Sequence, residues 1–269
     1  MTLIDIDAIG EILREATETA IVPRFRALGD GDVEEKSPGE VVTVADREAE
    51  ALISDGLRAV LPDVPVVGEE AVAADPSLLD ALATEPIAWL VDPLDGTANF
   101  AKGDPHWAVM VALVRDGAPV ASWMYRHTDQ RLYQAERGSG AWRDGIRLRC
   151  VASEPTLAIL RGSVLARFLT DDERARMVPR FGEFAAVTGG YLCAGYEYPA
   201  IIEGDQDFAL FQRLLPWDHA PGVLMLTEAG GVAQRPDGRA FDLDHIQRGL
   251  LLASSPDTWT AVHDILYLP

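Results

Sequence analysis

The spacing of apolar residues divides the first part of the chain into helices and short strands. From residue 5 to about 28, apolar side chains recur every three or four positions, which predicts an amphipathic helix. The polar stretch 30–40 follows and predicts a flexible loop. A second helical pattern is expected to begin at Asp46, whose carboxylate would cap the first turn, and to close at Pro62.

Short apolar runs bounded by turn residues predict the strands of a sheet. Two of them, residues 64–70 and 86–92, end in acidic residues. Further runs are separated by turn residues at hairpin spacing, which predicts antiparallel neighbours. These runs occupy residues 106–114, 119–127 and 131–136.

Helical and strand-like patterns alternate again in the second half of the chain. Strands are expected at residues 158–164 and 250–255. The alternation predicts an α/β protein with two halves, residues 1–147 and 148–269, of which the first carries most of the candidate metal ligands. Helices are expected at residues 170–181, 196–205, 216–231 and 256–266.

Composition and charge narrow the class of protein. The chain has 269 residues, 48% of them hydrophobic, which is enough for one or two globular domains. Its formal net charge of −20 disfavours nucleic acids and anionic membranes as partners, because both are negatively charged. The first residues carry acids instead of the apolar core of a secretory signal, and no later stretch reaches the roughly 20 apolar residues of a membrane span. A cytoplasmic location is therefore expected.

The cysteine content gives no sign of a disulfide framework or a zinc site. The two cysteines, Cys150 and Cys193, lie in unrelated apolar segments and form no CxxC pair. Two buried free thiols are expected.

The strongest local chemical signal follows the strand-like run at 86–92. In the segment DPLDGT, Asp92 and Asp95 lie on either side of a turn, because the proline between them forces the chain out of the strand. Gly96 and Thr97 then offer backbone N–H groups where a helix could begin, and such an end attracts anions. Ligands for cations thus lie beside donors for a phosphate group. By itself, the segment also fits an ordinary turn at the end of a strand.

Further acidic residues stand where apolar runs meet loops, namely Asp46, Glu69, Glu70 and Asp218. Such positions are fixed by a rigid scaffold, as the positions of catalytic and binding residues often are. Taken singly, the glutamates also fit surface acids, and the aspartates also fit helix N-caps. Taken together, carboxylates without clustered histidine or cysteine suit magnesium better than zinc.

In order and spacing, these residues resemble the inositol monophosphatase family. The match covers nearly the whole chain, and its most specific parts are a GEE run, the segment DPLDGTANF and a WD pair. The resemblance implies a layered αβαβα sandwich and a homodimer. It also implies magnesium-dependent hydrolysis of a small-molecule phosphate monoester. The residues that carry it are Lys36, Thr43, Asp46, Gly68 to Glu70, Asp92 to Phe100, Trp217 and Asp218.

The resemblance assigns the metal ligands to single residues. Glu69, Asp92 and the carbonyl of Leu94 would hold one magnesium ion. Asp92, Asp95 and Asp218 would hold a second, and two or three ions are expected in total. Such ions lower the pKa of an attacking water and stabilise the leaving oxygen.

The resemblance likewise implies the catalytic and substrate contacts. Thr97 and Asp46 would orient and deprotonate the attacking water, with Glu69 as a third catalytic residue. Backbone N–H groups of Gly96 and Thr97 would stabilise charge on the phosphoryl oxygens. Contacts to the substrate are expected from Asp95, Gly96, Thr97, Gly195 and Asp218.

The substrate pocket departs from the pattern of the inositol-cleaving members, which carry a glutamate where this chain has Phe211. An apolar ring leaves the hydroxyl groups of a polyol unpaired, which is costly on binding. Gln212 and Arg213 could instead serve another polar or anionic group. Three residues stay open between a role beside the site and a solvated or packing role: Lys36, Glu70 and His219.

The substrate and the need for turnover both leave alternatives. Related enzymes act on fructose bisphosphate, on 3′-phosphoadenosine nucleotides or on histidinol phosphate, so each is an alternative substrate. A regulatory protein that keeps the metal site without turnover is the alternative from another class.

Overall fold

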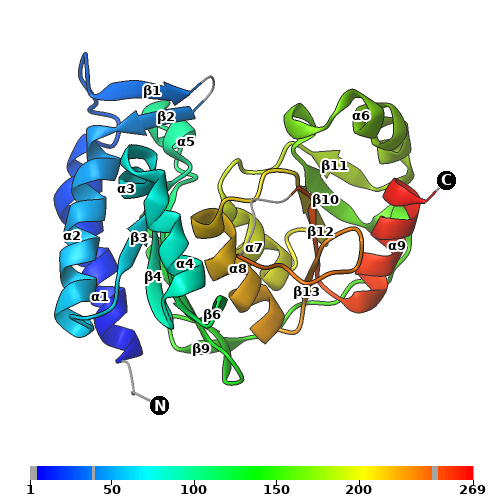
Figure 1. Cartoon of the computed structure of the whole chain (residues 1–269). Coiled ribbons are helices and arrows are strands. Elements are labelled where there is room, and N and C mark those ends of the chain that lie inside the picture. Colours follow the sequence, from blue (N-terminus) through cyan, green and yellow to red (C-terminus); the bar gives the residue numbers. More distant parts are fainter. Residues whose placement is uncertain (1–4, 38–39, 244–247, 269) are drawn as a thin grey trace.

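The computed structural model describes residues 5–37, 40–243 and 248–268 and shows an αβαβα arrangement of layers (Figure 1). Helices α1 and α2 cover one face of a seven-stranded sheet, and α7 and α8 lie between this sheet and a five-stranded sheet. Helices α6 and α9 cover the outer face of the second sheet. The expected α/β class and its layered sandwich are therefore confirmed. The bounds are α1 (Ile6–Ala16), α2 (Val44–Val60), α6 (Asp171–Met177), α7 (Ala194–Glu203), α8 (Pro216–Glu228) and α9 (Pro256–Tyr267).

The seven-stranded sheet contains every strand that the sequence predicts before residue 137. Its order is β3-β4-β5-β6-β7-β8-β9, and only β3 and β4 pair in parallel. The strands β8 and β9 were not expected, because so few residues show no clear alternation. The bounds are β3 (Val66–Gly68), β4 (Ile87–Asp95), β5 (Ala108–Arg115), β6 (Ala118–Arg126), β7 (Arg131–Glu136), β8 (Gly140–Arg143) and β9 (Ile146–Leu148).

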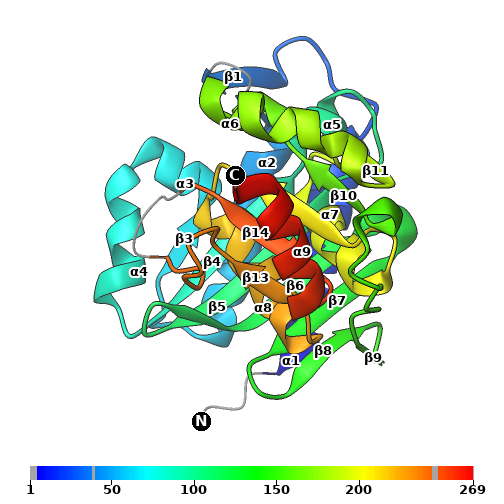
Figure 2. The same ribbon diagram turned by 90° about the vertical axis from the view of Figure 1, so that its right-hand side faces the viewer.

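The five-stranded sheet has the order β11-β10-β12-β14-β13. Strand β10 pairs in parallel with both of its neighbours, whereas β14 is antiparallel to both of its own. Figure 2 shows α9 lying across this sheet. Only β10 and β14 were expected from the sequence. The bounds are β10 (Arg161–Val164), β11 (Ala186–Thr188), β12 (Phe208–Phe211), β13 (Val232–Gln234) and β14 (Leu250–Ala253).

In the first 43 residues, the expected opening helix is present but irregular, and the expected loop is wrong. The regular α-helix ends at Ala16, and a π-helical turn η1 (Thr17–Ile21) and a 3-10 turn η2 (Val22–Arg24) continue the chain. Pro23 cannot supply an interior helical N–H, while the buried Ala20 and Ile21 keep the apolar spacing that suggested one longer helix.

The stretch expected to be a flexible loop is instead a hairpin. Strand β1 (Val33–Ser37) pairs antiparallel with β2 (Glu40–Thr43), and residues 38 and 39 lie outside the described part. The polar side chains hide this pairing, since backbone hydrogen bonds hold such a hairpin regardless of side-chain polarity.

Short helices complete the described part of the chain. Their bounds are α3 (Glu69–Ala74), η3 (Pro76–Asp80), α4 (Ala81–Thr84), α5 (Thr97–Ala101), η4 (His127–Asp129), η5 (Leu157–Ile159), η6 (Ala166–Phe168) and η7 (Val178–Glu183). None of the helices in the described ranges is both long and apolar enough to cross a membrane.

One apolar cluster joins the two sheets. It contains Met110 and Tyr133 from the first sheet, Leu252 from the second, and Ile201 and Leu224 from the helices between them. The strands of the first sheet nevertheless all precede those of the second along the chain. The division into domains at residue 147 stays a prediction.

Candidate metal and phosphate site

The end of β4 aims acidic groups at the space between the two halves. Pairing of β4 with β5 is regular as far as Asp92 and resumes only at Asp95, so the strand bulges between them. A bulge of this kind turns side chains away from the regular pleat. Asp92 is 1% exposed and accepts a hydrogen bond from the N–H of Leu94 at 3.1 Å.

Glu69 reaches the same space from the start of α3. The buried side chain of Glu50, on α2, accepts hydrogen bonds from the N–H groups of Glu70 at 2.7 Å and Ala71 at 2.8 Å, so it caps this short helix. A side chain at Gly68 would meet the Glu50 carboxylate at 2.3 Å, which explains the glycine before the two glutamates. Glu50 thereby fixes the helix that carries Glu69.

Lys36 lies beside these glutamates instead of in solvent. Its ammonium group, on β1, is 2.9 Å from Oε1 of Glu69 and 2.5 Å from Oε1 of Glu70. The sequence left open whether Lys36 lies beside the site or in solvent, and the structure places it at the acidic cluster. Burial raises the pKa of Glu69 to about 7, although the Lys36 charge opposes that shift.

Asp218 comes from the other half of the chain, in the first turn of α8. The N-cap of this helix is Leu215, so the alternative that Asp218 is only an N-cap does not hold. Its carboxylate, that of Asp92 and that of Glu69 offer oxygen atoms that all lie within 4.8 Å of one another. Burial raises the pKa of both aspartates well above the usual value, and the neighbouring negative charges add to this.

This donor set fits magnesium. It consists of carboxylate oxygens, the hard ligands that Mg²⁺ prefers, with no thiolate or imidazole among the three. Buried carboxylates that repel one another need cations to stay ionised, and Lys36 supplies one charge only. The fit therefore rests on the chemistry and the charge of these residues.

Asp95 is held in place by hydrogen bonds from the start of helix α7. Its Oδ2 accepts hydrogen bonds from the N–H of Gly195 at 2.6 Å and from the thiol of Cys193 at 3.0 Å. Burial raises the pKa of Asp95 to about 6, and these hydrogen bonds oppose the rise. A Cβ at position 195 would lie 2.4 Å from that of Ala108, so only glycine fits there.

Thr97 and Asp46 are in contact, 51 residues apart along the chain. The Thr97 hydroxyl lies 2.8 Å from Oδ1 of Asp46 and 2.8 Å from the carbonyl oxygen of Leu94, so its one hydrogen can be donated to either. Oδ2 of Asp46 accepts from the hydroxyl of Thr43 at 2.6 Å and from its N–H at 2.8 Å. Thr43 is the true N-cap of α2, and the expectation of a cap at Asp46 is wrong, because Asp46 completes the capping box from the third position.

Burial also affects the protonation of Asp46. It raises the pKa of this carboxyl group to about 6, while hydrogen bonds from Thr43 and Thr97 oppose the rise. The side chain is therefore an ionised acceptor near neutral pH.

Gly96 begins the short helix α5 beside these acids. Its φ of +84° is the left-handed conformation that glycine tolerates, and a Cβ there would lie 2.7 Å from the carbonyl oxygen of His106. The first N–H groups of a helix have no acceptor within it. Gly96, Thr97 and Ala98 line one cavity together with Glu69, Asp92, Asp95 and Asp218.

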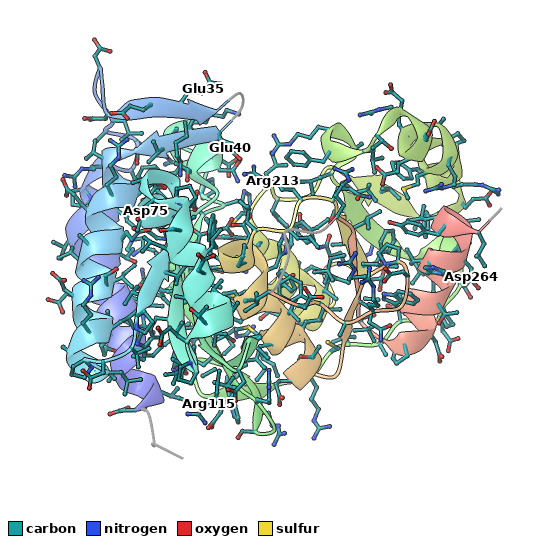
Figure 3. All side chains as sticks on the ribbon, viewed as in Figure 1. Glu35, Glu40, Asp75, Arg115, Arg213 and Asp264 are labelled. Carbon is teal, nitrogen blue, oxygen red and sulfur yellow. The ribbon has the colours of Figure 1, made fainter. Side chains whose placement is uncertain are left out.

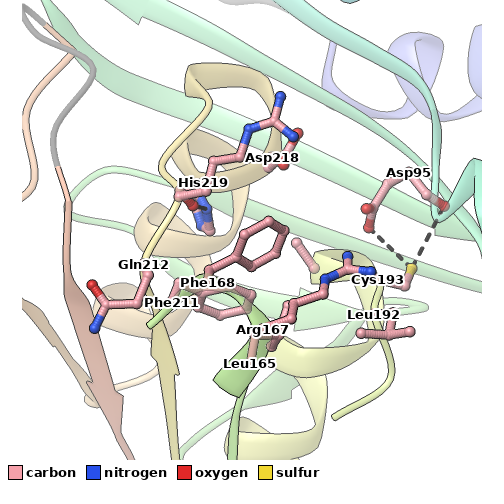
Figure 4. A pocket seen from close by; sticks show the side chains of 12 residues that line it. Asp95, Leu165, Arg167, Phe168, Leu192, Cys193, Phe211, Gln212, Asp218 and His219 are labelled. Atoms are coloured by element: carbon pink, nitrogen blue, oxygen red, sulfur yellow. Dashed lines mark hydrogen bonds between the residues drawn. The ribbon is translucent and has the colours of Figure 1, made fainter. Parts of the chain in front are cut away.

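A neighbouring cavity holds the residues expected around the substrate (Figure 4). Phe211 stacks on Tyr198 with ring centroids 6.0 Å apart and packs edge-on against His219 at 4.8 Å. Both ring nitrogens of His219 lie 3.0 Å from protein oxygens, those of the Tyr198 hydroxyl and the Arg213 carbonyl. Burial lowers the pKa of His219 to about 4, so the ring is neutral near pH 7. Of the two roles that the sequence left open for His219, these contacts support packing within the fold over binding at the site.

Arg213 bridges the two halves at the mouth of the site. Its guanidinium pairs with the carboxylate of Glu40 on β2. Figure 3 labels both residues. The hairpin β1–β2 thus contacts the site at two points, since Lys36 lies on its other strand.

Two residues of the site did not stand out in the sequence. Glu50 looked like one more acid of a charged helix face, although it lies one turn after Asp46 on that helix. Cys193 was expected to be an inert buried thiol, and it is free and buried as expected, but it also touches Asp95. Its partner is 98 residues away, so no local pattern could reveal the contact.

Comparison with known proteins agrees with this fold. The profile of the Inositol monophosphatase family matches residues 5–266, so the chain belongs to this family. It is a phosphatase, a hydrolase of phosphate monoesters that depends on magnesium.

Individual relatives differ in the substrates that their names state. The fructose-1,6-bisphosphatase/inositol-1-monophosphatase of Thermotoga maritima is 30% identical over 78% of this chain and 78% of its own length. The 3′(2′),5′-bisphosphate nucleotidase CysQ of Salmonella typhimurium is 28% identical over 88% of this chain and 93% of its own. The solved structure of the extragenic suppressor protein suhB from Bartonella henselae has a TM-score of 0.81 and 24% identity, with 97% of this chain and 99% of that chain covered.

Proposed function

We propose that the acidic cluster is the active centre, with residues from both halves of the chain holding two or three magnesium ions. Glu69, Asp92, Asp218, Asp95 and the Leu94 carbonyl would be the ligands. The observation that carries this proposal is the approach of Glu69, Asp92 and Asp218, whose ligand oxygens lie within 4.8 Å of one another. When bound, magnesium lowers the pKa of an attacking water and offsets charge on the phosphate group.

The chain's own residues orient the nucleophile and the phosphate. Thr97, with its hydroxyl 2.8 Å from Oδ1 of Asp46, would hold a water and pass its proton towards that carboxylate. The water oxygen forms a bond to phosphorus, the bond from phosphorus to the ester oxygen breaks, and a proton reaches the departing alkoxide. N–H groups at Gly96 and Thr97 would bind the phosphoryl oxygens at the start of α5.

The residues beside this centre favour a substrate other than an inositol phosphate. The buried Phe211 ring cannot pair with the hydroxyl groups of a polyol, and unpaired polar groups weaken binding. Substrate contacts at the centre itself would come from Asp95, Asp218 and Gly195, whose N–H holds Asp95. We therefore expect a small phosphate monoester with a less hydroxylated leaving group.

The substitution Asp92→Asn tests the active centre. It removes a ligand charge and is expected to lower turnover of β-glycerophosphate with magnesium by roughly a thousandfold, about 4 kcal/mol of transition-state stabilisation. Asp63→Asn, at an exposed aspartate, is the matched control and should retain activity. Near-normal activity of Asp92→Asn would exclude this centre. Magnesium binding without turnover in the unmutated protein would favour the regulatory alternative.

Location and assembly are part of the same proposal. The chain would act in the cytoplasm, and it would act as a homodimer, which is what its family resemblance implies. Light scattering of the purified protein tests the assembly, since a mass of 29.2 kDa belongs to the monomer and twice this value to the dimer.

A further inference from the structure

The cavity beside the acidic cluster continues away from it into a second groove. The first cavity is lined by Asp95, Asp218 and Arg167, and the groove beyond is lined by Val164, Phe181 and other apolar residues. Three residues line both spaces and mark their junction, namely Leu165, Arg167 and Leu192. A molecule anchored at the acidic cluster can therefore extend past this junction.

The two arginines of the first cavity differ in their partners. Arg213 is paired with Glu40. Arg167 makes no ion pair with any residue in the described ranges, although the chain carries a net charge of −20. Figure 4 shows Arg167 among the side chains around the cavity, beside Phe168. Its guanidinium carbon lies 4.6 Å from the centre of the Phe168 ring. This cation–π contact holds the guanidinium group without neutralising its charge.

A strained turn supplies the apolar side of the junction. Leu192 has a φ of +58°, in the left-handed region that a leucine rarely adopts, and the residue is 40% exposed. Hydrogen bonds fix the turn on both sides. Asn99 donates to the Tyr191 carbonyl at 2.8 Å, and Cys193 donates to Asp95 at 3.0 Å. Strain held in this way at the edge of a cavity is typical of functional positions.

We propose that Arg167 binds a second anionic group of the substrate, such as a second phosphate, and that Phe168 and Leu192 flank a flat ring next to it. This inference rests on the proposed function, since it requires the first phosphate at the acidic cluster. The substrate class is then a phosphate monoester whose leaving group carries both a ring and a second anion. Arg167 becomes a specificity-determining residue.

Electrostatics gives this assignment a physical basis. A substrate with two anionic groups approaches a strongly acidic chain, so a guanidinium that has no ion pair within the described ranges favours its entry into the cavity. A guanidinium also pairs with a phosphate through parallel N–H donors. The same charge disfavours substrates with a cationic leaving group.

Substrate pairs that differ in one group test the proposal. Adenosine 3′,5′-bisphosphate and adenosine 3′-monophosphate differ only in the second phosphate, fructose 1,6-bisphosphate has two phosphates without an aromatic ring, and β-glycerophosphate has neither feature. The variants are Arg167→Gln and Arg167→Lys. Arg149→Gln is the matched control, because Arg149 is exposed and lies outside the lining of the cavity.

The unmutated protein should prefer the adenosine bisphosphate to the monophosphate at least tenfold in kcat/KM. Arg167→Gln should reduce kcat/KM for the bisphosphate about 10- to 100-fold more than for the monophosphate, mainly through KM. Arg167→Lys should keep part of the preference, and Arg149→Gln should keep all of it.

Equal losses on both adenosine substrates would overturn the role of Arg167. If the unmutated protein hydrolyses fructose 1,6-bisphosphate as well as adenosine 3′,5′-bisphosphate, and Arg167→Gln loses equally on both, the role of the ring would be overturned. Absence of any β-glycerophosphate turnover would instead count against the proposed function. In that case, calorimetric binding of adenosine 3′,5′-bisphosphate to the unmutated protein and to Arg167→Gln still decides the role of Arg167.

Discussion

The thiol of Cys193 lies 3.0 Å from Oδ2 of Asp95, and this contact joins the start of α7 in the second half to the end of β4 in the first. The N–H of Gly195 reaches the same oxygen at 2.6 Å. Asp95 lines one cavity with Glu69, Asp92 and Asp218, and its Oδ2 is held from α7. The orientation of one proposed ligand thus depends on packing between the halves.

Removing the thiol should weaken magnesium binding. Cys193→Ala takes away a donor that lowers the pKa of Asp95, so its carboxyl group competes less well for the metal. We expect the magnesium concentration for half-maximal activity to rise about three- to tenfold, since a thiol is a weaker donor than a hydroxyl group. Cys193→Ser restores a donor and should stay close to the unmutated protein. An unchanged magnesium dependence in Cys193→Ala would contradict this role.

The contact between Thr97 and Asp46 predicts a pH dependence. Burial raises the pKa of Asp46 to about 6, so the ionised acceptor is present above this pH and is lost as the pH falls through it. At saturating magnesium, kcat should therefore decrease below about pH 6. Asp46→Asn should lower kcat about 10²- to 10⁴-fold and remove this acid limb from the residual activity. A residual activity with the same limb would assign it to another group.

The cap that Glu50 provides should be important for the metal site and for stability. Glu50→Gln keeps one acceptor for the N–H groups of Glu70 and Ala71 but places an amide donor against the other. We expect a loss of about 1–3 kcal/mol in the free energy of unfolding. The magnesium concentration for half-maximal activity should also rise, because Glu69 lies on the capped helix. Glu85→Gln, at an exposed glutamate, is the control, and equal behaviour of both variants in chemical denaturation would refute the prediction.

Magnesium should stabilise the folded chain. The buried Asp92 and the partly buried Asp218 repel one another, so a cation that binds only the folded state relieves this repulsion. At a hundredfold excess over its dissociation constant, magnesium should add about 2.7 kcal/mol, which is roughly 5–10 °C in melting temperature for a chain of this size. Thermal unfolding at pH 8 with magnesium or with a chelator measures the shift. No shift would mean that the cluster holds no ion.

Substitution of the strained Leu192 should affect stability and activity in opposite directions. Leu192→Asn suits the left-handed conformation better, so the free energy of unfolding should stay the same or increase by about 1 kcal/mol. If the side chain flanks the substrate ring, kcat/KM for ring-bearing phosphates should nevertheless fall. Denaturant titration and substrate kinetics on one preparation test both parts. A variant that loses stability would show that the leucine serves packing alone.

Local sequence patterns predicted much of the fold, and the strands that they failed to predict are short or polar. The runs at 86–92 and 106–136 form the central strands because continuous apolar residues are buried on both faces of the sheet. Strands such as β11 and β13 have three residues each, too few to show a period. The hairpin of β1 and β2 is polar because it lies at the edge of the site, where Lys36 and Glu40 form ion pairs instead of packing in a core.

The sequence by itself determined which chemical groups are available and the local geometry around them. The proline and glycine of DPLDGT dictate a turn, and the GEE run and the WD pair place carboxylates at element ends. Only the tertiary structure decided which of these groups meet. Glu69, Asp92 and Asp218 come from different elements, and their approach depends on the packing of α8 between two sheets. The same packing brings Arg167 into one cavity with Asp95 and Asp218, because distances between remote residues are set by how layers bury their apolar faces and not by any local pattern.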